Sequence, residues 1–559
     1  MSDPGYLAAM AHHASAHGAP HKGPLRRLGE ALRFERDDVW TVITFAVAVG
    51  VLSIVTPAAI EALVNTVAFG YQTWPVFVLA GVMLGFLVLS AALRAMQLYV
   101  VECLQRRFFV RTADAFADHF SRAEINAFDG RNPTDIVNRF FEVAAVQKAM
   151  ATLLVDGIGV VMVTIVGLAV LAFYHPYLLT FAAVMVGLIL FLMFGLGIGG
   201  VRTSIAESYA KFDVAAWLEE LAKCPHTFRF GQGGELAHRR ADDLADAYVN
   251  ARRRHFRVVW RQTIFALLLE AVAMTVLLGL GGWLVIQRQL TLGQLVAGEL
   301  IVALVLAALS KSGKYIETFY DLQASLDKLG VIEQLPIERE GGEVLPHGDQ
   351  PMRVTAELRA RRPGVEGGEM RRLDIRSGER VAISGPSGSG KTWLLETLAL
   401  LRVPQEGLLE FDGLDARSLD RPRTRLQLAY LGQAETFADT VAENVRVGRA
   451  DLSAADVRRA LEMVGLADTV ARLPDGNGTP LASDGLPLSA NDISRLSIAR
   501  AIAGRPRLLL VNGMLDRLDL RTCPELVDSL FDRAAPWTLA IVTAREDIKA
   551  RCDRVVEWS

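Results

Sequence analysis

The 559-residue chain lacks an excess of basic residues, because 59 Lys and Arg stand against 62 Asp and Glu and give a formal net charge of −3. A protein that binds nucleic acid normally carries a basic excess somewhere in its folded part. The composition therefore gives no reason to expect a nucleic-acid partner, and we expect none.

Cysteine is scarce as well. The chain has four cysteines, and their spacing fits no metal-binding pattern. All four fall in segments that we place in the cytosol, where disulfides are rare. We therefore expect four free thiols, at Cys103, Cys224, Cys523 and Cys552.

We do not expect residues 1–23 to be a signal peptide, since they are rich in His, Ala and Gly and lack an apolar core behind a basic start. Residues 25–36 place apolar side chains at helical spacing beside arginines. This pattern suits a helix on the membrane surface, or equally a solvated helix packed on its neighbours. We interpret residues 1–38 as a cytosolic tail with a possible interfacial helix.

Long apolar runs are abundant, and hydrophobic residues make up 51% of the chain while 22% are charged. A helix needs roughly 20 apolar residues to cross a bilayer. Arginines cluster in the long loops after the second and fourth runs, which predicts a cytosolic N-terminus and C-terminal part and a multi-pass protein of the cell (inner) membrane. Six runs fit, near 40–68, 76–101, 150–173, 177–199, 260–286 and 291–313.

Acidic residues within these runs are costly in a membrane, so each is a candidate for a substrate pathway. The alternative is a structural carboxylate paired with a neighbour such as Arg94. Glu270 lies nearest the middle of its run. The four acids are Glu61, Asp156, Glu270 and Glu299.

A phosphate-binding motif lies in the C-terminal part. The apolar run Arg380–Ser384 leads into a glycine-rich loop and then into a helical stretch over 393–398, the setting that a Walker A loop requires. Its backbone N–H groups close around phosphates, Lys391 supplies positive charge, and the Thr392 hydroxyl is suited to ligate Mg²⁺. The predicted nucleotide-binding residues of the loop are Gly385, Pro386, Ser387, Gly388, Ser389, Gly390, Lys391 and Thr392.

With these motifs in order, nearly the whole chain resembles an exporter-type half-transporter of the ABC family. Residues 126–140 resemble that family's first intracellular loop, 290–297 resemble the start of its sixth helix, and 429–433 resemble its Q-loop. The resemblance implies ATP and Mg²⁺ as cofactors, with Gln433 as a second Mg²⁺ contact beside Thr392.

The resemblance and the apolar runs together predict the fold class. We expect an α-helical transmembrane bundle of six spans with long cytosolic extensions over 39–328, then a linker over 329–350. An α/β P-loop ATP-binding domain is expected over 351–559.

Departures from the family pattern are equally informative. Where the family has Asp-Glu after a buried strand, this chain has Asn512 and Gly513, so neither a metal-anchoring carboxylate nor a general base is present there. The family's switch histidine corresponds to Ala544. We therefore expect no catalytic residue on this chain.

The family's signature also differs, because residues 488–492 read Leu-Ser-Ala-Asn-Asp. Ser489 is retained as a predicted nucleotide contact, whereas Asp492 would bring negative charge near a γ-phosphate. Arg362 stands near the place of the aromatic residue that stacks on adenine in the family, and Asp519 matches its dimer-contacting loop.

Nucleotide binding at a site with impaired, nearly silent hydrolysis is the resulting expectation, with a decayed, empty site as the alternative. In this family each ATP lies between one chain's Walker A loop and the other chain's signature, which implies a dimer. We favour a heterodimer with an intact second half-transporter over a homodimer, working in membrane lipid on an unidentified, amphipathic or peptide-like substrate. Alternatives are a non-hydrolysing, nucleotide-gated regulator, channel or receptor and, third, a structural subunit of a secretion assembly.

Overall fold

The computed structural model describes residue 29 and residues 36–69, 74–130, 132–359, 370–404, 406–520 and 523–558. It divides the chain into two compact units. The first takes residues up to Arg122 and Gly130–Pro336, and the second takes Ala123–Asp129 and Ile337–Ser559. The predicted interfacial helix over 25–36, apart from residues 29 and 36, and the position of Arg362 lie outside the described residues.

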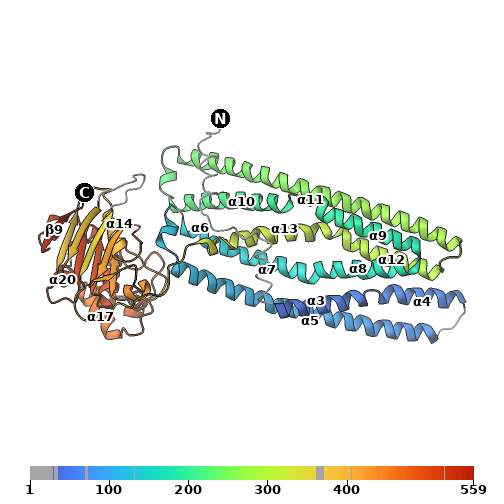
Figure 1. The fold of residues 1–559 in the computed structure, drawn as a ribbon, viewed down its shortest axis with the longest axis horizontal. Helices are drawn as coiled ribbons and strands as arrows, with labels where there is room; N and C mark the ends of the chain where they lie inside the picture. Colours follow the sequence, from blue (N-terminus) through green and yellow to red (C-terminus); the bar gives the residue numbers. More distant parts are fainter. Residues whose placement is uncertain are drawn as a thin grey trace. The chain divides into compact units, whose positions relative to one another are not determined.

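The first unit consists of long helices that run side by side (Figure 1). Six helical stretches within the described residues are long and apolar enough to cross a membrane, as the sequence predicts. The long loops are indeed helical extensions, because one helix runs without a break from Trp74 to Arg122 and another from Gly233 to Ile286. The helices are α3 (Arg36–Leu52), α4 (Val55–Phe69), α5 (Trp74–Arg122), α6 (Pro133–Asn138), α7 (Glu142–Thr152), α8 (Ile158–Tyr174), α9 (Pro176–Leu190), α10 (Gly200–Lys223), α11 (Gly233–Ile286), α12 (Leu292–Ser310) and α13 (Ser312–Leu329).

Two π-helical turns interrupt these helices, Leu153–Gly157 between α7 and α8 and Phe191–Gly195 between α9 and α10. A π-turn disturbs the backbone hydrogen-bond ladder. Buried glutamines supply donors at both places: the Gln97 amide lies 3.1 Å from the Leu154 carbonyl and the Gln262 amide 3.2 Å from the Leu192 carbonyl. These bonds fix α5 and α11 against the interrupted helices.

The second unit contains two sheets. One is antiparallel with strand order β2-β1-β4-β5, and the other is parallel with order β6-β7-β8-β3-β9. Two clusters of buried apolar side chains pack around the parallel sheet. The strands are β1 (Val354–Arg359), β2 (Met370–Ile375), β3 (Arg380–Ser384), β4 (Gly407–Phe411), β5 (Leu414–Asp415), β6 (Leu428–Leu431), β7 (Leu508–Asn512), β8 (Thr538–Val542) and β9 (Arg554–Glu557).

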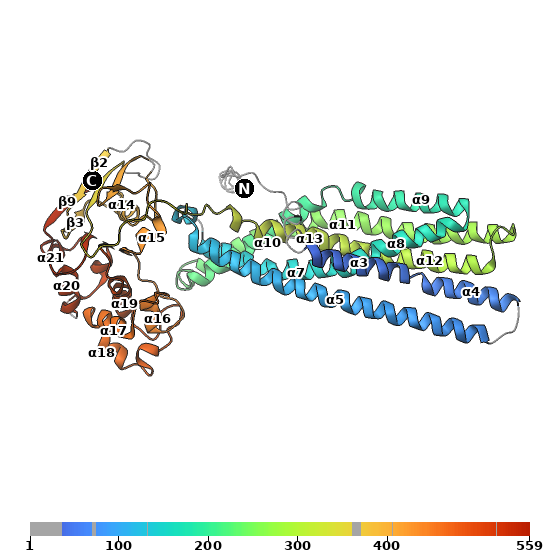
Figure 2. The ribbon, with the colours of Figure 1, turned by 60° about the horizontal axis from the view of Figure 1, so that its bottom comes forward.

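Helices cover this unit, and α16 to α19 gather on one side of it (Figure 2). The helix after the glycine-rich loop is α14, which begins at Lys391, two residues earlier than the sequence predicts. The helices are α14 (Lys391–Leu398), α15 (Arg421–Arg425), α16 (Val441–Arg446), α17 (Ala454–Met463), α18 (Ala467–Ala471), α19 (Ala490–Ala503), α20 (Pro524–Phe531) and α21 (Glu546–Lys549).

Candidate functional site

The candidate nucleotide site lies at the carboxyl edge of the parallel sheet. The register pairs Asn512 of β7 with Val542 of β8, and Val542 with Ile383 of β3. Because carboxyl ends of parallel strands meet at one edge, the segments that follow β3, β6, β7 and β8 come together there. These segments are the glycine-rich loop, the Gln433 loop, Gly513 and Ala544.

Lys391 is held across the glycine-rich loop, since its ammonium nitrogen lies 2.8 Å from the Gly385 carbonyl and 2.7 Å from the Pro386 carbonyl. The Ser389 hydroxyl is a further contact at 3.4 Å. The loop is thus preformed around the ammonium group. Because α14 begins at Lys391, its unpaired backbone N–H groups and the ammonium charge are available to the same anion.

All three glycines of the loop have physical reasons to be glycine. A Cβ on Gly385 would lie 2.0 Å from the Trp558 carbonyl oxygen, and Gly390 has a φ of +88°, where other residues are strained. Gly388 has open space around it, but its φ of +80° would strain any other residue. The loop therefore keeps the backbone cradle that phosphates need, and it fits the phosphates of a nucleotide.

Asn512 contacts the hydroxyl that the sequence assigns to Mg²⁺. Its side-chain nitrogen lies 3.1 Å from Thr392 Oγ1 and 3.3 Å from the Tyr430 hydroxyl. A primary amide has two N–H donors, so both hydroxyls accept from Asn512. Tyr430 lies in the segment 429–433 that resembles the Q-loop, and no sequence motif signals this contact.

The carboxylate nearest to Ala544 is already engaged. Asp516 accepts hydrogen bonds from the Thr543 hydroxyl and, at 3.0 Å, from the Ala544 backbone N–H. Gly513 has a φ of +65°, and no heavy atom lies within 4 Å of a Cβ built on it. The edge therefore offers neutral groups at Asn512, Gly513 and Ala544.

These residues offer few oxygen ligands for a Mg²⁺ ion. Thr392 uses one of its lone pairs for Asn512, while Gln433 is exposed. No group of three or more His, Cys, Asp or Glu side chains in the described part of the chain is arranged to hold a metal ion. The two predicted ligands are therefore present without a carboxylate that would fix a hydrated Mg²⁺.

Ser489 is the N-cap of α19 and forms a capping box with Asp492. The Ser489 hydroxyl lies 2.6 Å from an Asp492 carboxylate oxygen and accepts from the Asp492 backbone N–H at 3.2 Å. The other carboxylate oxygen binds Arg495. The negative charge expected at Asp492 is thus compensated inside the chain, a pairing that the Ser-x-x-acidic spacing could have signalled.

The acids in the apolar runs differ in their surroundings. Glu61 accepts a hydrogen bond of 2.7 Å from the Tyr174 hydroxyl, so its partner is a tyrosine and not an arginine. Asp156 is exposed on a π-turn. Glu270 and Glu299 are half-buried, and no hydrogen bond or ion pair joins either to another described residue.

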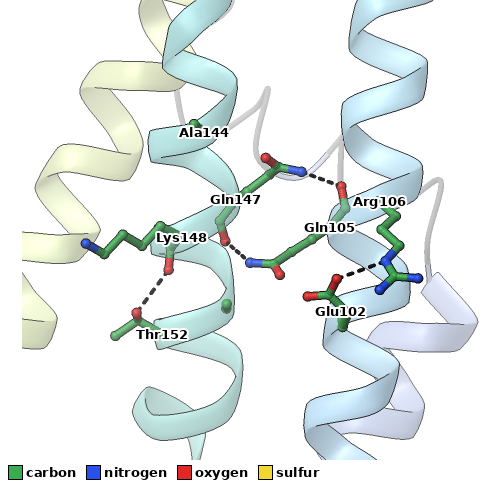
Figure 3. Close-up of a pocket in the computed structure, with 8 residues that line it drawn as sticks. Glu102, Gln105, Arg106, Ala144, Gln147, Lys148 and Thr152 are labelled. Carbon is green, nitrogen blue, oxygen red and sulfur yellow. Dashed lines mark hydrogen bonds and ion pairs between the residues drawn. The ribbon is translucent and has the colours of Figure 1, made fainter.

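A hollow of about 460 Å³ lies between α5 and α7 in the helical unit. Gln105 and Gln147 each donate from the side-chain amide to the other's backbone carbonyl, at 2.8 and 2.6 Å (Figure 3). Glu102 pairs with Arg106 at 2.8 Å. These polar groups satisfy one another, so we interpret the hollow as a helix contact rather than as a ligand site.

Comparison with known families gives two matches. Residues 39–309 match the ABC transporter transmembrane region, and residues 370–512 match the ATP-binding domain family described as ABC transporter. The two matches together span most of the chain. The second match implies ATP binding.

Similar proteins agree with this result. The mycobactin import ATP-binding/permease protein IrtB of Mycolicibacterium thermoresistibile is 26% identical over 80% of this chain and 78% of its own length. The leukotoxin translocation ATP-binding protein LktB of Mannheimia glucosida is 22% identical over 90% of this chain and 72% of its own. A structure of a bacterial Atm1-family ABC exporter with ATP bound shares the fold, with a TM-score of 0.81, 20% identity and 93% coverage of both chains. The chain therefore belongs to the ABC transporter family, as a multi-pass half-transporter with the exporter fold in which the membrane helices precede an ATP-binding domain.

Proposed function

We propose that this chain is one subunit of a dimeric exporter that binds ATP at its Walker A loop and hydrolyses it poorly there. The observation that carries this proposal is the neutral edge at Asn512, Gly513 and Ala544, where Asp516 is the nearby carboxylate and is engaged by Thr543 and Ala544. A general base alone is worth about 10²–10⁴-fold in rate. Losing it therefore slows the chemical step severely without removing the phosphate cradle.

ATP binding is supported by the loop itself. Lys391 is positioned by the Gly385 and Pro386 carbonyls, and α14 directs its N-terminus at the same place. The contacts of the outer phosphates would be the loop residues and, across a dimer, Ser489 of a signature. Thr392 and Gln433 are the side chains that would approach a Mg²⁺ ion arriving with the nucleotide.

The dimer partner decides whether the assembly hydrolyses ATP. Two copies of this chain would form two poor sites, whereas an intact second half-transporter would bring its own carboxylate and histidine to one of the two sites. We propose the heterodimer. The altered signature that this chain would place over the partner's nucleotide is ordered by its own capping box at Ser489 and Asp492.

Orientation and domain roles complete the proposal. The arginine-rich extensions of the membrane helices support a cytosolic N-terminus and ATP-binding domain in the inner membrane. We assign residues 39–328 to the membrane domain, 329–350 to the linker and 351–559 to the ATP-binding domain. Export is proposed as the direction of transport, with an amphipathic or peptide-like substrate.

The test compares binding with turnover in the purified full chain. We expect a fluorescent ATP analogue to bind, Lys391→Ala to weaken that binding by about tenfold or more through loss of a charge-assisted contact, and phosphate release to stay near the level of Lys391→Ala. Co-expression with a second half-transporter that has an intact Asp-Glu pair should give a stable complex with ATPase activity. Equal analogue binding by wild type and Lys391→Ala would contradict the assignment of the loop, and a failure to form an active complex would favour a nucleotide-gated regulator.

A further inference from the structure

The side chain at the end of β7 determines which charge faces the phosphates. An aspartate there would repel a metal-free nucleotide, because two negative charges a few ångströms apart interact strongly in a partly buried site. Such a carboxylate becomes favourable only when a hydrated cation lies between it and the phosphates. Asn512 removes this repulsion and with it the need for the cation.

The geometry adds a positive contribution to this change of charge. Asn512 is half-buried and directs its amide N–H groups to Thr392 Oγ1 at 3.1 Å and to the Tyr430 hydroxyl at 3.3 Å. Amide hydrogens carry partial positive charge, and here they face Thr392 Oγ1, the hydroxyl predicted to ligate Mg²⁺. The Tyr430 hydroxyl keeps its own hydrogen for donation to a phosphate oxygen, whereas the Thr392 hydroxyl also lies 3.5 Å from Asn512 Oδ1 and can donate to it.

Of the charged groups at this edge, Lys391 favours an anion, whereas the carboxylates of Glu396 and Glu435 act on Tyr430 from nearby. Lys391 is held in place by the Gly385 and Pro386 carbonyls. Asp516 is occupied by the Thr543 hydroxyl and the Ala544 N–H. The described part of the chain has no cluster of metal-ligating side chains.

We propose that this Walker site binds the phosphates of a nucleoside triphosphate without requiring Mg²⁺, with the Asn512 amide compensating charge where a metal-anchoring carboxylate is missing. The inference rests on the proposed function, since it specifies the form of nucleotide that the same loop takes. The site would then bind metal-free and Mg²⁺-bound nucleotide with similar affinity.

The experiment titrates a fluorescent ATP analogue into the purified full chain, in excess Mg²⁺ and in excess EDTA. We expect the two dissociation constants of the wild type to agree within about threefold, because no carboxylate depends on the metal. Asn512→Asp should lose about tenfold or more in EDTA and regain its affinity in Mg²⁺, as the restored carboxylate requires the ion. Asn512→Ala should remain insensitive to Mg²⁺ but bind a few-fold more weakly in both conditions, since its N–H donors are gone.

The outcomes separate this inference from the proposed function. Binding by the wild type in Mg²⁺ but not in EDTA overturns the inference and leaves ATP binding intact. Binding in neither condition overturns the proposed function and the inference with it. If the Asn512→Ala variant binds the ATP analogue in EDTA as tightly as the wild type does, the amide has no role in compensating charge.

Discussion

The Arg402 guanidinium forms a bidentate pair with the Asp129 carboxylate. Its Nη1 lies 2.7 Å from Oδ2 and its Nη2 lies 2.9 Å from Oδ1. The same guanidinium binds Asn126 Oδ1 at 2.6 Å and the Glu396 carboxylate of α14. Asp129 and Asn126 belong to the segment Ala123–Asp129, which joins α5 to α6 in sequence but packs in the second unit. Arg402 therefore connects this segment to the helix that begins with Lys391.

Arg402→Ala should separate nucleotide binding from transport. The substitution removes a bidentate, charge-assisted contact with Asp129. This contact contributes about 1 kcal/mol to stability, because Asp129 is largely exposed. The substitution also removes the arginine that pairs with Glu396. We expect transport by the assembled dimer to fall by about tenfold while the affinity for an ATP analogue changes less than about twofold, since Lys391 is untouched. The measurements are uptake into inside-out vesicles and analogue titration.

A matched control is Arg417→Ala, which removes an arginine from an exposed pair with Asp415 at 2.8 Å in the same unit. This variant should transport normally, because the pair lies within one turn of chain. Equal losses in both variants would show that general surface charge, and not the Arg402 contact, supports transport.

The pH dependence of the Arg402–Asp129 pair follows from the direction of one pKa shift. Hydrogen bonding to Arg402 lowers the pKa of Asp129 below its ordinary value of 3.8. A carboxyl with a lowered folded pKa stabilises the fold above its unfolded pKa and loses that contribution as pH falls through the folded value. Protection of the segment 123–129 from proteolysis should therefore be constant between about pH 5 and 8 and decrease only below about pH 4. A decrease between pH 6 and 7 would show that another group controls the segment.

Glu61 and Glu270 should respond differently to the same substitution. Glu61 is bonded to the Tyr174 hydroxyl, and glutamine can still accept that bond, so Glu61→Gln should leave transport within about twofold of wild type. Glu270 lies half-buried with no bond to a described residue, and an unpaired acid in a membrane span is costly unless it serves function. Glu270→Gln should therefore alter transport or substrate-stimulated ATPase activity of the dimer without lowering expression.

Two results would change this assignment. If Glu270→Gln fails to accumulate in the membrane while Glu61→Gln accumulates, the Glu270 carboxylate is structural. If both variants transport normally, neither acid lines the substrate pathway.

The capping box of α19 predicts a local stability effect. Asp492→Ala removes the N3 side chain that binds the Ser489 backbone N–H and deprives Arg495 of its partner, whereas Asp492→Gln keeps the box without the charge. Loss of the box should cost about 1 kcal/mol and lower the Tm of the chain in detergent by about 2–4 °C. Asp492→Gln should lie closer to wild type, and a larger loss for glutamine than for alanine would contradict the capping role.

Motifs with a fixed order along the chain were predictable from the sequence. The strand Arg380–Ser384 and the helix after the loop follow from a short apolar run before the glycine-rich loop and a helical stretch after it. The six spans follow from length and apolarity alone. Contacts between residues far apart in the chain were not predictable, because no local pattern encodes them. Arg402 with Asp129, 273 positions apart, and Asn512 with Tyr430, 82 positions apart, depend on tertiary packing.

The positive φ at Gly513 affects the last prediction, in which three substitutions in this chain restore hydrolysis. The triple change Asn512→Asp, Gly513→Glu, Ala544→His supplies the missing carboxylates and imidazole. The new side chains have room, because the space around a Cβ built on Gly513 is open and Ala544 is exposed. A glutamate at a φ of +65° is strained by about 1–2 kcal/mol, which lowers stability and opposes the gain. Catalytic groups that act as a unit are non-additive, so Gly513→Glu alone should do little.

We expect phosphate release by the triple variant, assembled as a homodimer, to exceed that of the same variant carrying Lys391→Ala. Adding Ala490→Gly, Asn491→Gly and Asp492→Gln should raise it further, by roughly tenfold or about 1.4 kcal/mol, because the facing signature is then also repaired. Asp516→Asn in the otherwise unmodified chain is the matched control. It removes one of the two oxygens that accept from Thr543 and Ala544 but should leave phosphate release at the level of the unmodified chain. High turnover by the unmodified chain that disappears in Asp516→Asn would instead assign the chemistry to Asp516, because no restored group would then be needed.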